Sequence, residues 1–182
     1  MRTVTRAPRA CTIAAPLLVV TTSLDDGAHA GRLFGLVPSV TVLGVFGHPG
    51  PAEPVIDLRE AQPIATMSLG RAPGERTKTG AIADLIGDAI VRSGAATVAV
   101  GLGLGGGDRQ EAADAALLAR RRRRSRIGWI VYVDAVADSD AGRVARRRMQ
   151  LFMRGIRLEP VAVAEAPLGT SARFWQIRAA DG

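Results

Sequence analysis

The sequence predicts one three-layer α/β domain over residues 1–182, with a mostly parallel β-sheet, helices on both faces and an antiparallel strand at the C-terminal edge. Three observations predict it. Strand-like apolar runs alternate with helix-like segments, as in parallel sheets joined by right-handed crossovers. The run Ile127–Val133 shows no polar alternation, which indicates a central strand covered on both faces. A chain of 182 residues is long enough for one full core and too short for two comfortable domains.

Local patterns place the elements of this Rossmann-like arrangement. Strands are expected over Ile13–Thr22, Ser39–Phe46, Pro63–Leu69, Ala96–Val100, Ile127–Val133, Leu158–Ala164 and Arg173–Arg178. Helices are expected over Asp26–Leu36, Gly80–Ser93, Asp108 to about Arg124, and from Asp138 or Ser139 to about Arg154. Residues 1–10 precede these elements and are expected to form a flexible basic arm.

Apolar spacing also predicts which face of each helix is buried. In Gly80–Ser93 the apolar residues recur at i, i+3, i+4, i+7 and i+8, which makes a single stripe, and Gly94 supplies the stop. Helix starts are expected at Ser23 or Asp25 and at Asp108, as N-caps. In the last helix the predicted buried face is Ala141, Ala145, Met149, Phe152 and Ile156, with Arg143, Arg146, Arg147 and Arg154 on other faces.

The composition limits the chemistry of the chain. Cys11 is the only cysteine, so internal disulfides and cysteine-clustered zinc sites are excluded. His29 and His48 are the only histidines, and we predict no metal centre. The net charge is +7, and residues 96–182 carry most of the excess. Lys78 is the only lysine; this arginine bias reflects either a coding bias or selection for groups that grip phosphate with two hydrogen bonds.

Two interpretations fit the N-terminus. Arginines followed by the apolar run Cys11–Val20 form the outline of a secretory signal cleaved near Ala30. Pro16 and the acidic pair after the run instead favour a buried first strand. We therefore expect a cytoplasmic protein, with export as the alternative. No run reaches the roughly 18–20 apolar residues that a membrane span needs.

The most informative stretch joins the strand Ala96–Val100 to a helix through a glycine turn with the spacing G-x-G-x-x-G. In that order of elements, backbone N–H groups and a helix N-terminus can approach a phosphate. We predict that a nucleotide-like or phosphate-bearing ligand binds there, with Asp134 as a polar partner. The alternative is a glycine turn at a sheet edge that binds nothing. The predicted ligand-binding glycines are Gly101, Gly103, Gly105, Gly106 and Gly107.

One segment is similar to a known enzyme family. Ile130–Asp134 followed by Asp138 resembles the second strand of class I S-adenosylmethionine-dependent methyltransferases, whose terminal acidic residue holds the ribose hydroxyls. The turn Gly101–Gly107 is similar to the glycine loop of that family. The resemblance implies an adenosine-containing cofactor and a group-transfer enzyme. The strand Thr97–Val100 departs from the family pattern because it lacks an acidic residue.

The densest charge in the chain is the run Arg120–Arg124. The C-terminal end of a helix dipole is negative and favours cations, so a solvated helix end is one interpretation. Together with Arg143 and the arginines at 146–148, the run would instead form a patch that neutralises phosphates. This alternative function is non-catalytic binding of nucleic acid or an acidic partner through Arg121, Arg122, Arg123 and Arg124.

Other catalytic signatures are not found in the sequence. It has neither a G-x-x-x-x-G-K-S/T phosphate loop nor a G-x-S-x-G nucleophile elbow. Asp25, Asp26, His29 and His48 are expected near strand ends, where a histidine beside carboxylates can act as a general base. The simpler alternative is a helix cap and a surface histidine. The sequence therefore assigns no catalytic residue.

Overall fold

The computed structural model describes residues 8–34, 36–47, 55–56, 63–72, 78–123, 126–133, 140–166 and 171–178. Its elements, in chain order, are β1 (Arg9–Cys11), β2 (Leu17–Thr21), α1 (Leu24–Leu33), β3 (Val40–Phe46), β4 (Val55–Ile56), β5 (Pro63–Arg71), α2 (Thr79–Ser93), β6 (Thr97–Gly101), α3 (Gly107–Arg122), β7 (Gly128–Val133), α4 (Ala141–Met153), β8 (Leu158–Val163) and β9 (Arg173–Ile177). The predicted alternation of strands and helices is confirmed.

The described strands form one mixed, mostly parallel sheet in the order β1-β8-β9-β7-β6-β2-β3-β5-β4. β2 lies inside the sheet and pairs in parallel with β3 on one side and β6 on the other. From β2 the chain moves outward through β3 to β5, and then returns to the opposite side of β2 as β6 and β7. The direction of winding therefore reverses between β2 and β6, and such a switch point opens a crevice at the carboxyl ends of the strands.

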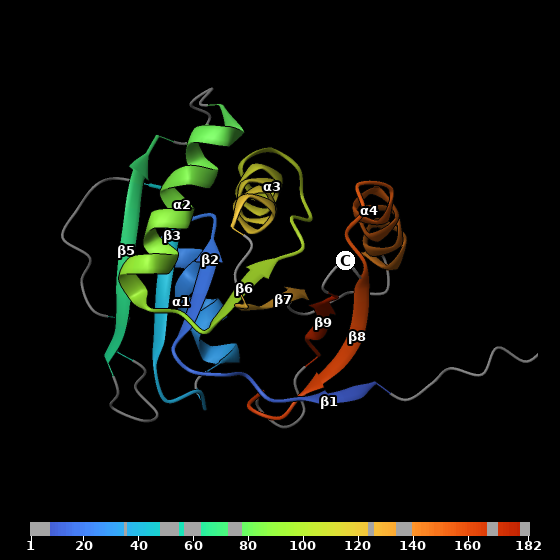
Figure 1. Ribbon diagram of the computed structural model, residues 1–182, viewed down its shortest axis with the longest axis horizontal. Coiled ribbons are helices and arrows are strands. Elements are labelled where there is room, and N and C mark those ends of the chain that lie inside the picture. The colour runs from blue at the N-terminus through green and yellow to red at the C-terminus, as the bar shows by residue number, and fades with distance from the viewer. Residues whose placement is uncertain are drawn as a thin grey trace, which may run out of the picture.

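Helices cover both faces of the sheet, as predicted (Figure 1). Alternate residues of β2 point to opposite faces: Leu17 and Val19 pack with α1, whereas Leu18 and Val20 belong to the core beneath α2 and α3. β2 is fully buried on both faces, which explains its uninterrupted apolar sequence. The buried face of α3 consists mostly of alanine, so this helix lies close to the sheet and to α2.

One prediction about the edge of the sheet is wrong. β9 is antiparallel as expected, but it lies between β7 and β8 and is not an edge strand. The sheet continues beyond β8 to β1, where Arg9–Cys11 pairs in parallel with Val161–Val163. This strand includes Arg9 and Ala10 of the predicted N-terminal arm, whose residues 1–7 lie outside the described part of the chain. β1 has only three residues and pairs with a single strand, so it shows no apolar periodicity that the sequence could reveal.

The predicted buried face of α4 is also wrong. Val144, Arg147 and Leu151 are buried, whereas Arg147 was expected on an outer face. The residues expected inside the helix interface, Ala141, Ala145, Met149 and Phe152, are exposed; Ile156, just beyond the helix, is buried as expected. Apolar residues at helical spacing lie on two sides of α4, and the sequence pattern selected the side that the sheet does not cover.

None of the helices in the described part of the chain is long and apolar enough to cross a membrane.

The core beneath α2 yields a direct test. Ile86 is completely buried, and Ile86→Ala should lower the free energy of unfolding by about 2–5 kcal/mol because it leaves a cavity. Val91 lies on the same helix and is 63% exposed, so Val91→Ala should change stability by less than about 0.5 kcal/mol. Urea unfolding of both variants measures these changes in the free energy of unfolding. Equal effects would contradict the placement of α2.

Candidate ligand-binding site at the switch point

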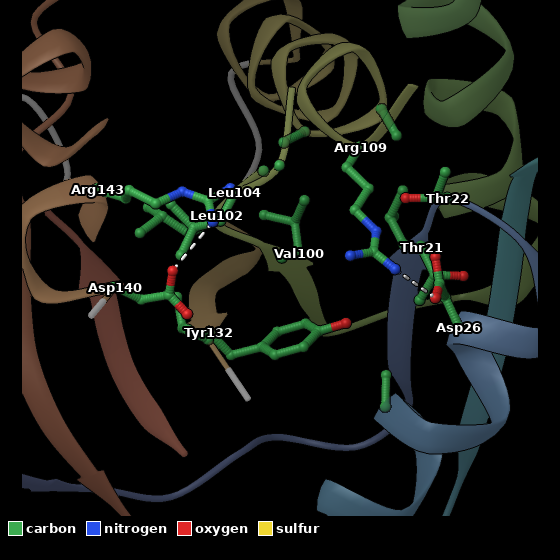
Figure 2. A pocket seen from close by; sticks show the side chains of 18 residues that line it. Thr21, Thr22, Asp26, Val100, Leu102, Leu104, Arg109, Tyr132, Asp140 and Arg143 are labelled. Atoms are coloured by element: carbon green, nitrogen blue, oxygen red, sulfur yellow. Dashed lines mark hydrogen bonds and ion pairs between the residues drawn. The ribbon is translucent and has the colours of Figure 1, made fainter. Parts of the chain in front are cut away.

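A cavity of about 440 Å³ lies at the carboxyl ends of β2, β6 and β7. We call it the switch-point cavity. Its walls come from Thr21 and Thr22 at the end of β2, from the segment 101–105 at the end of β6, and from the end of β7. The N-terminal halves of α1 and α3 and the first turn of α4 complete the lining (Figure 2). The volume is within the range of about 300–1,000 Å³ that is typical of small-molecule sites.

The glycine turn forms one wall of this cavity. Gly101, Gly103 and Gly105 line it, whereas Gly106 and Gly107 begin α3 and are not among its lining residues. Gly103 has φ +76°, and a Cβ built there would lie 2.9 Å from the Cβ of Ala113. A side chain at Gly103 would therefore push the turn away from α3. The other predicted ligand residue, Asp134, lies outside the described residues.

The helix starts differ in part from expectation. Ser23 caps α1, since its Oγ accepts a hydrogen bond from the backbone N–H of Asp26 at 3.2 Å. Asp108, however, is not the N-cap of α3: Gly106 occupies that position without a side-chain cap, and Asp108 lies in the first turn. The predicted N-cap position of Asp108 is therefore wrong by two residues.

Two arginine–carboxylate pairs stand on opposite sides of the cavity (Figure 2). Arg109 of α3 reaches Asp26 of α1 at 3.2 Å, and Arg143 of α4 reaches Asp140 at 3.0 Å. Both arginines are exposed, and exposed pairs of this kind contribute only about 0–1 kcal/mol each. Each guanidinium is therefore held in place weakly enough to exchange its carboxylate for an anionic ligand.

Part of the cavity lining is apolar. Val20, Val100 and Leu102 contribute to it, and the ring of Tyr132 lies between the two arginines (Figure 2). Phe34, which directly follows α1, packs edge-to-face against Tyr132, with 5.5 Å between ring centroids and an interplanar angle of 84°. This contact fixes the orientation of the tyrosine ring. The site can thus hold an apolar or aromatic body with an anionic end.

A buried arginine positions the glycine turn. Arg147 of α4 is only 4% exposed, and its Nε donates a hydrogen bond to the carbonyl oxygen of Leu102 at 3.1 Å. A second guanidinium nitrogen donates to the carboxylate of Asp114 in α3 at 2.6 Å, and Gln150 accepts a longer bond at 3.4 Å. Asp114 also pairs with Arg154 at 3.0 Å. Sequence analysis missed this network, because a burial signal for an arginine depends on partners that are distant in the chain.

The arginine run forms ion pairs that join the end of α3 to α2. Arg122 pairs with Asp84 of α2, and Arg123 pairs with Asp88 one turn further along, at 3.2 Å. Arg123 crosses directly over Gly87, where a Cβ would come within 2.6 Å of its Nε. Arg120 donates to the carbonyl oxygen of Arg178 at 3.0 Å, and its burial lowers the pKa of the guanidinium. A polyanion at this end of α3 would have to compete with these pairs.

The remaining candidate residues are only partly placed. Arg121 is exposed, and Arg124 lies outside the described residues. Asp26 lines the cavity; the side chains of Asp25 and His29, and the whole of His48, are outside what the structure describes. Within the described part of the chain, no three histidine, cysteine, aspartate or glutamate residues are grouped so that they could hold a metal ion.

These features define an α/β protein with a ligand-sized cavity at the switch point of its sheet. Comparison with protein-family models gives no match, and neither does comparison with curated proteins. Three solved structures share the fold, each with a TM-score of 0.51 over 91% of this chain. They are a triple mutant of a deacetylase of the teicoplanin biosynthetic pathway (14% identity, 98% of that chain), the A40926 pseudoaglycone deacetylase Dbv21 (16%, 98%) and a deacetylase–teicoplanin complex (16%, 99%). At these identities the likeness shows the α/β fold.

The network around Arg147 predicts an asymmetry between its two partners. Asp114→Asn leaves a buried guanidinium without its counter-charge and should lower the free energy of unfolding by about 3–5 kcal/mol. Arg147→Met removes the buried charge and leaves Asp114 paired with Arg154, so its effect should be smaller. Arg154→Met is the matched control: this exposed pair should be worth about 1 kcal/mol or less. The free energy of unfolding of all three variants should be measured with denaturant. A larger loss of that free energy for Arg147→Met than for Asp114→Asn would contradict this account.

Proposed function

We propose that the protein binds a small phosphate-bearing ligand of nucleotide-like character in the switch-point cavity. The observation that carries the proposal is the placement of Arg109 and Arg143 on opposite sides of a cavity walled by the glycine turn. An arginine fork matches the geometry of phosphate oxygens and donates two hydrogen bonds to them. The N-terminal first turns of three helices face the same space, and their dipoles add to the attraction for an anion.

The apolar part of the cavity supports a ligand larger than phosphate alone. Val100 and Leu102 offer aliphatic contacts, and the fixed ring of Tyr132 offers an aromatic one. A nucleoside base or a similar ring would pack there while its phosphate meets the arginines. Group transfer with an adenosine-containing cofactor remains our proposal for an enzymatic role. The chain passes directly from Val133, which lines the cavity, to Asp134, the residue that we propose for the ribose.

A ligand panel tests the proposal. Thermal unfolding should be measured with inorganic phosphate, AMP, ATP, NAD and S-adenosylmethionine, each over a concentration series. A ligand at a hundred times its Kd stabilises the folded state by about 2.7 kcal/mol, and that corresponds to a rise in Tm of about 5–10 °C for a chain of this size.

Arginine variants test whether a ligand that raises Tm binds in the switch-point cavity. Arg109→Gln and Arg143→Gln should each weaken binding at least fivefold, because each removes a charged donor from the cavity. Arg121→Gln, an exposed arginine of α3 that does not line the cavity, should leave the affinity unchanged. The proposal would be excluded if no ligand of the panel raised Tm, or if all three variants lost the same affinity for a ligand.

A second candidate function is removal of an acetyl group. It is favoured by the solved structures with this fold, which are described as deacetylases. In such a hydrolysis water adds to the acetyl carbonyl, the bond to the amine or alcohol breaks, and acetate leaves. Asp26, beside Thr21 and Thr22 in the cavity, is the carboxylate that we propose would accept the proton of the water and pass it to the departing amine or alcohol.

Incubation with teicoplanin and with acetylated amino sugars, followed by mass spectrometry, separates the two functions. If the cavity is hydrolytic, the acetyl group is lost, and Asp26→Asn abolishes the loss while leaving Tm nearly unchanged. An absence of product from every substrate, together with a Tm shift by a nucleotide, would exclude hydrolysis and retain ligand binding.

A further inference from the structure

We propose that α4 docks on an anionic lipid surface through its exposed apolar side. This side consists of Ala141, Ala145, Met149, Phe152 and Met153, and we call it the outer stripe. It is independent of the switch-point cavity, since none of its residues lines that cavity.

The outer stripe is an apolar surface that the domain itself does not use. Met149 is 59% exposed, Phe152 58% and Met153 76%. Val144 and Leu151, on another side of the helix, already attach α4 to the core. α4 stands at one end of the molecule, above β8 and β9 (Figure 1). Large exposed apolar side chains gathered on one helix mark an interaction surface.

Arginines border the outer stripe on both sides. At helical spacing, Arg148 lies between the stripe and the core-facing side, and Arg146 lies beyond Met153. The guanidinium of Arg148 rests 5.5 Å from the ring centroid of Trp175. Neither arginine forms an ion pair with any described carboxylate, and α4 itself contains no acidic residue. The apolar ridge is therefore framed by positive charge, and the complementary surface is anionic.

The size of the outer stripe selects a membrane over a protein partner. A helix of 13 residues is about 20 Å long, so one face covers on the order of 200 Å². A stable protein interface buries about 800 Å² on each partner. A second copy of this chain would also bring arginine against arginine, which is unfavourable. Lipid binding has no such threshold, because each inserted apolar group and each arginine near anionic headgroups adds its own contribution.

The test is co-sedimentation of the full chain with vesicles. Binding is expected to vesicles that contain phosphatidylglycerol, to weaken as salt is raised, and to be much weaker with phosphatidylcholine alone. The double variant Met149→Ser/Phe152→Ser should reduce the partition coefficient at least tenfold. Arg146→Gln should reduce it about fivefold, the factor for a contribution of about 1 kcal/mol per arginine.

Matched controls separate this effect from general surface change. Val91→Ser removes an equally exposed apolar side chain from α2, and Arg92→Gln removes an exposed arginine there; neither should change vesicle binding. Unchanged thermal unfolding of all variants shows that the fold is retained. The proposal is overturned if the wild-type chain ignores anionic vesicles, if the double variant binds as well as wild type, or if the stripe instead drives dimerisation in lipid-free solution.

Discussion

The arrangement of the cavity depends on one buried charge, the guanidinium of Arg147. It is satisfied by the Leu102 carbonyl, the Asp114 carboxylate and the Gln150 side chain, and a buried charge is stable only with such partners. Leu102 belongs to the glycine turn and Asp114 to α3, so one side chain of α4 holds three segments together. Arg143 lies one helical turn before Arg147, and its position at the cavity follows from the same anchor.

The two arginines of the cavity are each neutralised by a carboxylate in the structure. Asp26 and Asp140 lie at the starts of α1 and α4, where the positive end of a helix dipole stabilises a carboxylate. Each also neutralises one cavity arginine. In the function that we propose, an incoming anion must take the place of these carboxylates. A ligand with several acceptor oxygens on one centre competes best, because it meets each guanidinium with two hydrogen bonds. This reasoning favours phosphate over a simple monoanion.

The sequence was sufficient for the elements with a continuous apolar run or a regular helical period. β2, β6 and β7 are continuous apolar runs, and α2 carries one apolar stripe, so these elements follow expectation. The glycine turn was predicted from its G-x-G-x-x-G spacing, and in the structure φ is positive at Gly103, Gly105, Gly106 and Gly107, a conformation that only glycine adopts easily. β1 and β4 are too short to show any period. The Arg147 network depends on contacts between residues 33 and 45 positions apart, which local patterns do not encode.

The misassigned face of α4 shows how polar contacts can decide helix orientation. The outer stripe offers as much apolar surface as the pair Val144 and Leu151, so apolar burial alone does not select the observed face. Rotating the helix to bury Met149 and Phe152 would turn Arg147 away from Leu102 and leave that carbonyl without its donor. An unpaired buried carbonyl costs about 1–3 kcal/mol, and the loss of the ion pair to Asp114 adds to it. The polar network therefore fixes the orientation, and the apolar surface left outside is a direct consequence of that choice.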